Sequence, residues 1–238
     1  MKNKKLKIIF LCCAFEAGII AFVALANLFD NSIYYIFYNL FYGIGASVLI
    51  PLLILRKENA TLETLGIKKL GARQIVVLAS FVAFSVGGQI VPKVASGEML
   101  RWNVLPVAIL PLVMTTFFEE FLFRGFLQTR LEKQFGAVIA IIVSGLLFAL
   151  YHLGYPGFRA ASDILLLFAV GIGFAVSFKL AENNLIVSYF VNLPNAFVTY
   201  ILKCEQFPRM TILSTMFAGI TIILIAAILF AMKIKEMK

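Results

Sequence analysis

The chain has 238 residues, of which 62% are hydrophobic and 14% are charged, and its formal net charge is +9. Soluble domains are about 45–50% apolar and about 25% charged, so the composition excludes an ordinary soluble domain and indicates a polytopic membrane protein. Basic residues lie between apolar runs and are not gathered with aromatics in one patch, which argues against nucleic-acid binding. We therefore expect one integral membrane domain over 1–238, with the lipid bilayer as its partner.

Apolar runs that are long enough to span a bilayer recur along the whole chain. Each is close to the roughly 20 residues that a transmembrane helix needs. They predict an all-α bundle of about eight transmembrane helices, and hence a multi-pass protein of the cell membrane. The runs are 8–29, 33–55, 74–92, 104–123, 137–153, 162–179, 184–202 and 210–232.

The basic residues divide unevenly between the two sides that eight spans would create. Sixteen of the 21 fall on one side. Because the cytoplasmic flanks of membrane proteins carry the excess of Lys and Arg, both termini are expected in the cytoplasm. The larger group is Lys2, Lys4, Lys5, Lys7, Arg56, Lys57, Lys68, Lys69, Arg73, Arg124, Arg130, Lys133, Lys179, Lys233, Lys235 and Lys238, and the smaller is Lys93, Arg101, Arg159, Lys203 and Arg209.

The fourth run contains two adjacent carboxylates and an arginine, Glu119, Glu120 and Arg124. An ionisable group inside a membrane span costs roughly 2.5–3.5 kcal/mol on insertion scales, so such groups usually face a bundle interior and carry function. On a helix, Glu120 and Arg124 are four residues apart and within reach of a salt bridge. Glu119 is turned by about 100° from its neighbour. We predict that the arginine neutralises one carboxylate and leaves the other for chemistry.

Three further polar residues in later runs are candidates for the same site. His152 is the single histidine of the chain, and a carboxylate and an imidazole that converge on one water form a general base with an orienting partner. The alternative is a histidine at the membrane interface. Asn192 and Asn195 flank Pro194 in the seventh run and could donate hydrogen bonds to an oxyanion. Alternatively, they hydrogen-bond across the bundle or to carbonyls freed by the proline.

The motif Glu119-Glu120-xxx-Arg124, followed by Phe148-xxx-His152, resembles the CPBP family of intramembrane proteases. This family includes the type II CAAX prenyl endopeptidases and bacteriocin-processing or immunity proteins. The resemblance implies that Glu119 is the catalytic base that activates water, with Glu120 and Arg124 supporting it. It also implies that His152 orients the water or polarises the substrate.

The motif-bearing core extends over about 104–202, and it departs from the family in its third motif. That motif normally reads His-xxx-Asn. Here Asn192 stands at the expected position of the histidine, Ala196 lies four residues on, and Asn195 is one residue short of register. An amide can donate to an oxyanion as a neutral imidazole does, but it cannot share a proton.

Straight spans would not bring the first two motifs together. If the fourth span starts near residue 104, Glu119 lies roughly 23 Å along it, whereas His152 at the end of the next span would lie near the opposite face. The site therefore requires one of two arrangements. Either the fourth helix continues past Arg124, which moves Glu119 towards the middle of the membrane, or the fifth helix is displaced or tilted.

The remaining unusual groups are an acid and the cysteines. Glu16 lies in the first run, where it has a function, pairs with a hydroxyl group of the bundle or remains protonated. Cys12, Cys13 and Cys204 match no disulfide or zinc spacing and are interpreted as packing residues. A zinc site is disfavoured, because the chain has no HExxH motif and only one imidazole. We expect no metal and no cofactor.

The leading hypothesis is an intramembrane endopeptidase that uses glutamate-activated water to hydrolyse a membrane-associated or lipid-modified peptide or protein. The predicted catalytic residues are Glu119, His152, Glu120, Arg124, Asn192 and Asn195. Two alternatives stay open. One is a non-catalytic peptide-binding or immunity protein of the same fold, and the other is a transporter with a proton or cation path along the buried acids.

Overall fold

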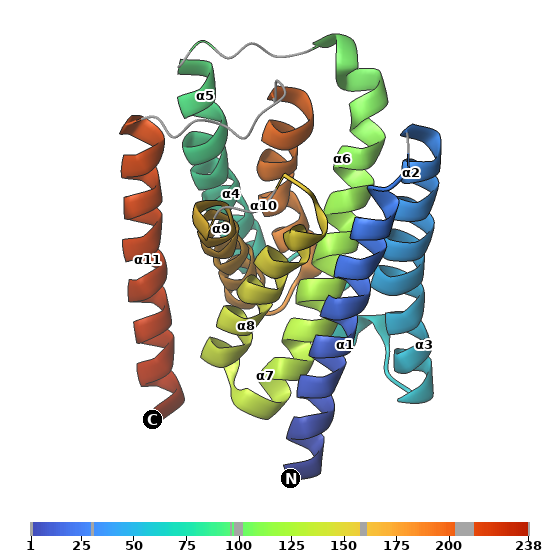
Figure 1. The fold of residues 1–238 in the computed structure, drawn as a ribbon. Coiled ribbons are helices and arrows are strands. Elements are labelled where there is room, and N and C mark those ends of the chain that lie inside the picture. Colours follow the sequence, from blue (N-terminus) through green and yellow to red (C-terminus); the bar gives the residue numbers. More distant parts are fainter. Residues whose placement is uncertain are drawn as a thin grey trace.

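The structure is a computed structural model that describes residues 2–29, 31–95, 97, 102–157, 161–202 and 212–237. All regular structure in these ranges is helical (Figure 1). Helices satisfy their backbone hydrogen bonds within one segment, which is the requirement that the apolar interior of a bilayer imposes. The predicted all-α membrane bundle is confirmed.

The described residues of the first half of the chain form three long helical stretches, and the connection 58–71 lies between the second and the third. Several of these stretches change from α to π winding without a break in the helix. The elements are α1 (Lys2–Ala26), α2 (Asn31–Phe37) continued by η1 (Tyr38–Leu49) and α3 (Ile50–Lys57), the 3₁₀ turn η2 (Leu62–Leu65), and α4 (Ala72–Ser85) continued by η3 (Val86–Ile90) and α5 (Val91–Ala95).

The second half contains the predicted motifs and forms five more stretches. The elements are η4 (Trp102–Val104), then α6 (Leu105–Glu119) continued by η5 (Glu120–Gln128) and α7 (Thr129–Phe135), α8 (Ala137–Leu150) continued by η6 (Tyr151–Gly154), α9 (Ala161–Leu180), α10 (Leu185–Phe197) continued by η7 (Val198–Leu202), and α11 (Ile212–Met237).

Each predicted apolar run overlaps one of these stretches. Within the described residues, five helices are long and apolar enough to cross a membrane, and they support a multi-pass location in the membrane. The total of eight crossings stays a prediction. The five are Asn3–Ala26, Tyr38–Lys57, Ala72–Ala95, Ala137–Gly154 and Asp163–Leu180.

Most of the basic segments gather at one end of the bundle. In Figure 1 the start of α1, the end of α3, α7 and the end of α11 lie at the same end, at the bottom of the view. We call it the basic end and define it as residues 4–7, 56–73, 129–136, 179–184 and 233–237. The prediction that Arg124 belongs to this basic flank is wrong. Its side chain is fully buried in the bundle, because the helix continues to Phe135. The cytoplasmic location of this end stays a prediction.

The length of the fourth helical stretch explains how the motif with Glu119 can lie at the same level as the motif with His152. It runs without interruption from Leu105 to Phe135, which is the first of the two arrangements considered above. Gly136, with a φ of 85°, then reverses the chain into α8. The 14 residues of α8 rise about 21 Å, so Tyr151 and His152, which follow at once in η6, lie short of the ~30 Å of a hydrocarbon core. Accordingly, α8 ends part-way up the bundle in Figure 1, below the upper end of α6.

Glycines let α8 and α9 approach closely in the interior. A Cβ on Gly145 would lie 2.9 Å from the backbone nitrogen of Ile172, and one on Gly171 would lie 2.9 Å from the carbonyl oxygen of Gly145. Larger residues would therefore separate the helices at this level. Small residues commonly allow such packing in membranes. The close packing fixes the backbone of Gly171, which contributes to the site.

Candidate active site

The first motif lies where the long helix widens from α to π winding. The nine residues of η5, Glu120–Gln128, are all buried. π-Helical segments are uncommon and occur frequently at functional sites. The winding changes directly after Glu119, so the two adjacent glutamates belong to different helical geometries.

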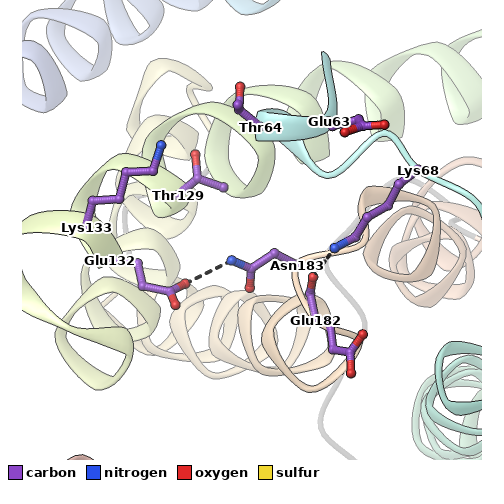
Figure 2. Close-up of a pocket in the computed structure, with 8 residues that line it drawn as sticks. All are labelled: Glu63, Thr64, Lys68, Thr129, Glu132, Lys133, Glu182 and Asn183. Carbon is purple, nitrogen blue, oxygen red and sulfur yellow. Dashed lines mark hydrogen bonds between the residues drawn. The ribbon is translucent and has the colours of Figure 1, made fainter. Parts of the chain in front are cut away.

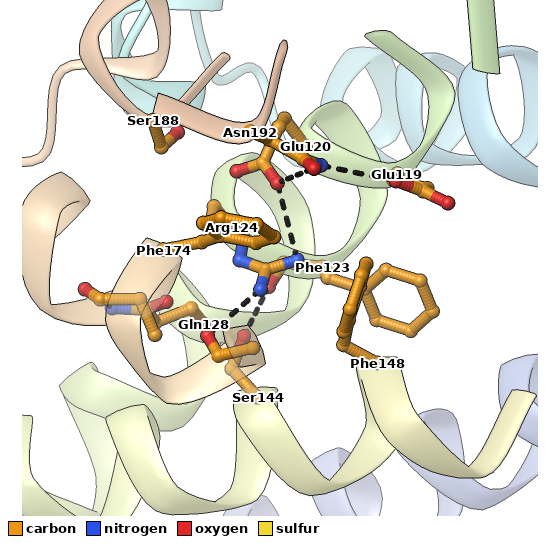
Figure 3. A network of polar contacts seen from close by, with 12 residues as sticks. Glu119, Glu120, Phe123, Arg124, Gln128, Ser144, Phe148, Phe174, Ser188 and Asn192 are labelled. Carbon is orange, nitrogen blue, oxygen red and sulfur yellow. Dashed lines mark hydrogen bonds and ion pairs between the residues drawn. The ribbon is translucent and has the colours of Figure 1, made fainter. Parts of the chain in front are cut away.

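Glu120 and Arg124 form the predicted ion pair. The distance between Arg124 Nη1 and Glu120 Oε1 is 3.3 Å, and neither side chain is exposed to solvent (Figure 3). Arg124 Nη2 also donates to the carbonyl oxygen of Gly171, at 2.9 Å. The guanidinium carbon lies 4.6 Å from the ring centre of Phe148 and 5.3 Å from that of Phe174. A buried charge needs such partners, because its desolvation would otherwise be very unfavourable.

Glu119 is held by two donors from other helices. The hydroxyl group of Tyr151 donates to Oε1, and the amide of Asn192 donates to Oε2 at 3.0 Å. The glutamate is 7% exposed, whereas Glu120 is completely buried. The adjacent acids therefore differ, since Arg124 pairs with Glu120, whereas Glu119 accepts hydrogen bonds from two neutral donors. The use of Glu119 in chemistry stays a prediction.

Asn192 bridges the two carboxylates. Its Nδ2 donates to Glu119 Oε2 and, at 2.9 Å, to Glu120 Oε1 (Figure 3). An amide nitrogen carries only two hydrogens, so these two bonds use both of them. In this arrangement Asn192 positions the acids and has no hydrogen left for an oxyanion. Asn195 Nδ2 donates to Asn192 Oδ1 at 3.4 Å, a long bond that uses one of its own two hydrogens.

His152 lies on η6, beside the residue that holds Glu119. Its ring centre is 4.1 Å from that of Tyr151, and the residue is 8% exposed. Its Nδ1 is 2.9 Å from the carbonyl oxygen of Phe148. A carbonyl only accepts, so Nδ1 bears the proton and the Nε2 of a neutral ring is an acceptor. Of the two roles that the resemblance implies, this tautomer fits orientation of a water.

Tyr151 is the site residue that sequence reasoning missed. It is fully buried, and its ring stacks on that of Tyr42, with 5.7 Å between the ring centres. Its only signal in the sequence is its position directly before His152. Tyrosine is common at membrane interfaces, so that signal does not separate a site residue from an interfacial one.

More tyrosines surround the same point. Tyr42 stacks on Tyr151, and the hydroxyl groups of Tyr155 and Tyr38 are hydrogen-bonded at 2.7 Å. The ring centres of Tyr155 and His152 are 5.8 Å apart. Phenols from η1, from η6 and from the residue directly after η6 therefore lie around the site and give it a polar surface within a largely apolar bundle.

Glu16 is buried in α1 and lies outside this hydrogen-bond network. Within the described part of the chain, neither of its carboxyl oxygens has a hydrogen-bond partner. The predicted pairing with a hydroxyl group of the bundle is thus wrong for these residues. Tyr42, which stacks on Tyr151, lies within electrostatic range of both Glu119 and Glu16.

The structure offers little to a metal ion. Among the residues described, no group of three or more histidine, cysteine, aspartate or glutamate side chains is arranged to hold one. The expectation that the reaction needs no metal stays a prediction.

Residues of the basic end line a polar cavity of about 460 Å³, which Figure 2 shows from close by. Its lining contains none of the predicted catalytic residues. Two of its acids are already paired, Glu132 with Lys179 and Glu182 with Arg73. The lining residues are Glu63, Thr64, Lys68, Thr129, Glu132, Lys133, Glu182 and Asn183.

Comparison with protein families identifies the part of the chain that carries the motifs. The family model described as type II CAAX prenyl endopeptidase Rce1-like matches residues 101–197. This segment is Rce1-like. The match confirms the resemblance found in the motifs, and the Rce1-like segment contains all six predicted catalytic residues. It supports a CAAX-type intramembrane protease as the general class of activity, with a membrane environment and a peptide substrate. No curated protein and no solved structure gave a significant match to the chain.

Proposed function

We propose that the protein is an intramembrane endopeptidase that hydrolyses a peptide bond of a membrane-associated or lipid-modified peptide or protein through water activated by Glu119. One observation carries the proposal. The Glu119 carboxylate lies inside the bundle, is oriented by Tyr151 and Asn192, and stands directly beside an acid that is already neutralised by an arginine. Such an arrangement keeps one carboxylate available as a general base.

The reaction needs four steps at one carboxylate. Glu119 accepts a proton from a water molecule, and the oxygen of that water forms a bond to the carbonyl carbon of the substrate. The carbonyl electron pair moves to the oxygen and gives a tetrahedral oxyanion. The C–N bond then breaks, and the amine leaves with the proton that Glu119 had accepted. The products are a new carboxylic acid, which passes its proton to the released amine to give a carboxylate and an ammonium group, and Glu119 is regenerated as a carboxylate.

The other residues position the base and the water. Arg124 and Asn192 fix Glu120 and thereby the turn of helix that carries Glu119. His152, protonated at Nδ1, accepts a hydrogen bond from the attacking water at Nε2. Asn195 supplies the amide hydrogen for the oxyanion, because both hydrogens of Asn192 are already used.

A non-catalytic peptide-binding protein is the second candidate, and one observation favours it. Asn192 replaces the histidine of the third family motif and locks both acids together through neutral hydrogen bonds. An amide cannot transfer a proton in this position. If the reaction required that transfer, the same pocket would bind a peptide without cleaving it.

The test compares the wild type with Glu119→Gln in membranes from cells that lack the gene. The purified protein is added, and new protein N-termini are identified by mass spectrometry in water enriched in ¹⁸O. We expect N-termini that depend on the wild-type protein and are absent with Glu119→Gln, with one ¹⁸O in each matching new C-terminus. The matched control is Glu182→Gln, an acid on the exposed turn after α9, which should retain cleavage.

Binding of peptides by both forms without cleavage would establish the second candidate, and proton or cation flux that Glu119→Gln abolishes would establish transport.

A further inference from the structure

Buried residues lie between Glu119 and the basic end of the bundle. A structure that we call the basal seal lies there, formed by residues 58–71, α7 and the turn 181–184. These three segments are far apart in the sequence. Arg130 of α7 pairs with Glu58, Asn183 donates to Glu132 of α7, and Leu65 lies against Gly125 of η5. A peptide that approached Glu119 from this end would have to pass through them.

The apolar part of the seal is the turn η2, whose last residue, Leu65, is buried among the helices of the bundle. Leu65 is fully buried and belongs to the main apolar core. A Cβ on Gly125, within η5, would lie 3.0 Å from the carbonyl oxygen of Leu65. Gly66 has a φ of 83°, and a Cβ there would lie 2.3 Å from the carbonyl oxygen of Asn183. Only glycine fits both the left-handed conformation and this contact, so the turn is built to pack against the helices around it.

Polar contacts fix the rim of the same seal. The amide nitrogen of Leu185 donates to the carbonyl oxygen of Gly66 at 2.9 Å. Asn184 Nδ2 donates to the carbonyl oxygen of Lys69 at 3.2 Å. Gln74 Nε2 donates to Glu182 Oε2 at 2.8 Å. The loop after α3 is therefore joined by hydrogen bonds to the turn between α9 and α10.

Two buried layers separate the seal from the catalytic carboxylate. Arg124 and Gln128 follow Glu120 along η5 towards the basic end, and both are fully buried. Gln128 Nε2 donates to the carbonyl oxygen of Ala175 at 3.0 Å, which closes the gap between η5 and α9. The polar cavity of Figure 2 lies on the basic side of these layers. Its lining residue Thr129 directly follows Gln128 in the chain.

The solvent exposure of the side chains around the site increases in the opposite direction, from the level of Glu119 towards the end of the bundle that lies opposite the basic end. Along α10 and η7, away from the basic end, Asn192 is fully buried, Asn195 is partly exposed and Thr199 is exposed. Along η6 the order is the same: Tyr151 is buried, and Tyr155 just after it is partly exposed. Two separate elements thus become more accessible as they leave the level of Glu119 for the far end.

We infer that the substrate reaches Glu119 from the far end of the bundle and that the basal seal excludes substrates from the basic end. The positive-inside rule assigns the basic end to the cytoplasm. The substrate class is then a peptide or anchored protein whose scissile bond is presented from the extracytoplasmic side of the membrane. This inference rests on the proposed function only in treating the peptide as a substrate. The route to Glu119 is a separate property, and it can be measured without activity.

The test is the accessibility of single cysteines to a small, cationic, membrane-impermeant methanethiosulfonate. In a background with Cys12, Cys13 and Cys204 changed to alanine, the reporter is Thr115→Cys, one helical turn before Glu119. Thr115 is buried, and its hydroxyl group accepts from Tyr200 at 3.3 Å, so the small thiol is a mild replacement. Thr199→Cys marks the far end and Lys133→Cys marks the basic end, since both positions are exposed.

We expect the reporter to behave like Thr199→Cys. Both should be modified in intact cells, and the reporter should react at least about ten times more slowly in sealed inside-out vesicles, where Lys133→Cys reacts fast. Modification of the reporter from the Lys133 side alone, or from neither side, would overturn the route. Modification of Lys133→Cys in intact cells would overturn the assignment of the basic end to the cytoplasm.

A second variant tests whether the seal is the barrier. Leu65→Ala, added to the reporter, should raise the rate of modification in inside-out vesicles at least several-fold. An unchanged rate would show that η2 does not close the site. Because none of these measurements needs turnover, loss of the proposed protease activity and loss of the proposed route are distinguishable results.

Discussion

The interior of the bundle and the basal seal both contain acid–base pairs, but they use them differently. Glu120 and Arg124 are wholly buried, and the arginine also bonds to a backbone carbonyl and faces aromatic rings. Glu182, in the seal, and Arg73, at the start of α4, are joined at 3.0 Å while both side chains remain exposed. A buried pair whose partner is removed leaves an uncompensated charge, whereas an exposed pair exchanges its partner for water. The exposed pair is the closer of the two, at 3.0 Å against 3.3 Å, yet it should contribute less to stability than the buried pair does.

The largest effect on stability is expected for Arg124→Gln. It leaves Glu120 buried without a cation and the carbonyl oxygen of Gly171 without its donor. Removing one member of a buried pair typically costs about 3–5 kcal/mol. Chemical denaturation of the protein in detergent micelles should show a loss of this size. The double variant Glu120→Gln/Arg124→Gln is the control, since it removes both charges and should recover part of the loss. Equal stability of Arg124→Gln and the wild type would mean that the interior pair behaves like the exposed one.

An intermediate effect is expected for Tyr151→Phe. The change keeps the ring that stacks on Tyr42 and removes only the hydroxyl group that donates to Glu119. The loss of a hydrogen bond to a charged group corresponds to about 1.5–3 kcal/mol. We expect cleavage to slow by at least about ten-fold, mainly in kcat, because the base loses its orientation while the substrate surface is unchanged.

The control for this change is Tyr189→Phe, since the Tyr189 hydroxyl group makes only a long bond, 3.4 Å, to the carbonyl oxygen of Val113. That variant should retain both cleavage and stability. Equal effects of the two substitutions would show that Tyr151 contributes packing and not orientation of Glu119.

Several features of the interior follow from the sequence alone. The spacing of Glu120 and Arg124 predicts their ion pair, and the structure contains it. The apolar runs predict the helical stretches closely. These predictions succeed because they depend on helix periodicity and on the thickness of the bilayer, which are local properties.

Other features depend on the meeting of distant segments and could not be predicted. Arg124 was assigned to a flank because its apolar run ends there, but the helix continues through a π-wound segment that hydropathy does not reveal. The contact of Tyr151 with Glu119 depends on the level at which α8 ends. The use of both hydrogens of Asn192 depends on where α10 meets two adjacent acids. Each is fixed by tertiary packing, which a pattern along one chain does not record.

The smallest effect is expected for Glu182→Gln in the basal seal. Its carboxylate bonds to Arg73 and Gln74, and both Glu182 and Arg73 are exposed, so water and salt screen the pair. Exposed pairs contribute about 0–1 kcal/mol, and the glutamine can still accept one of these hydrogen bonds. Denaturation should therefore differ from the wild type by less than about 1 kcal/mol, and the rate of cleavage should not change. A loss as large as that of Arg124→Gln would mean that the seal is stabilised by its charges, and the apolar plug at Leu65 would then no longer explain its closure.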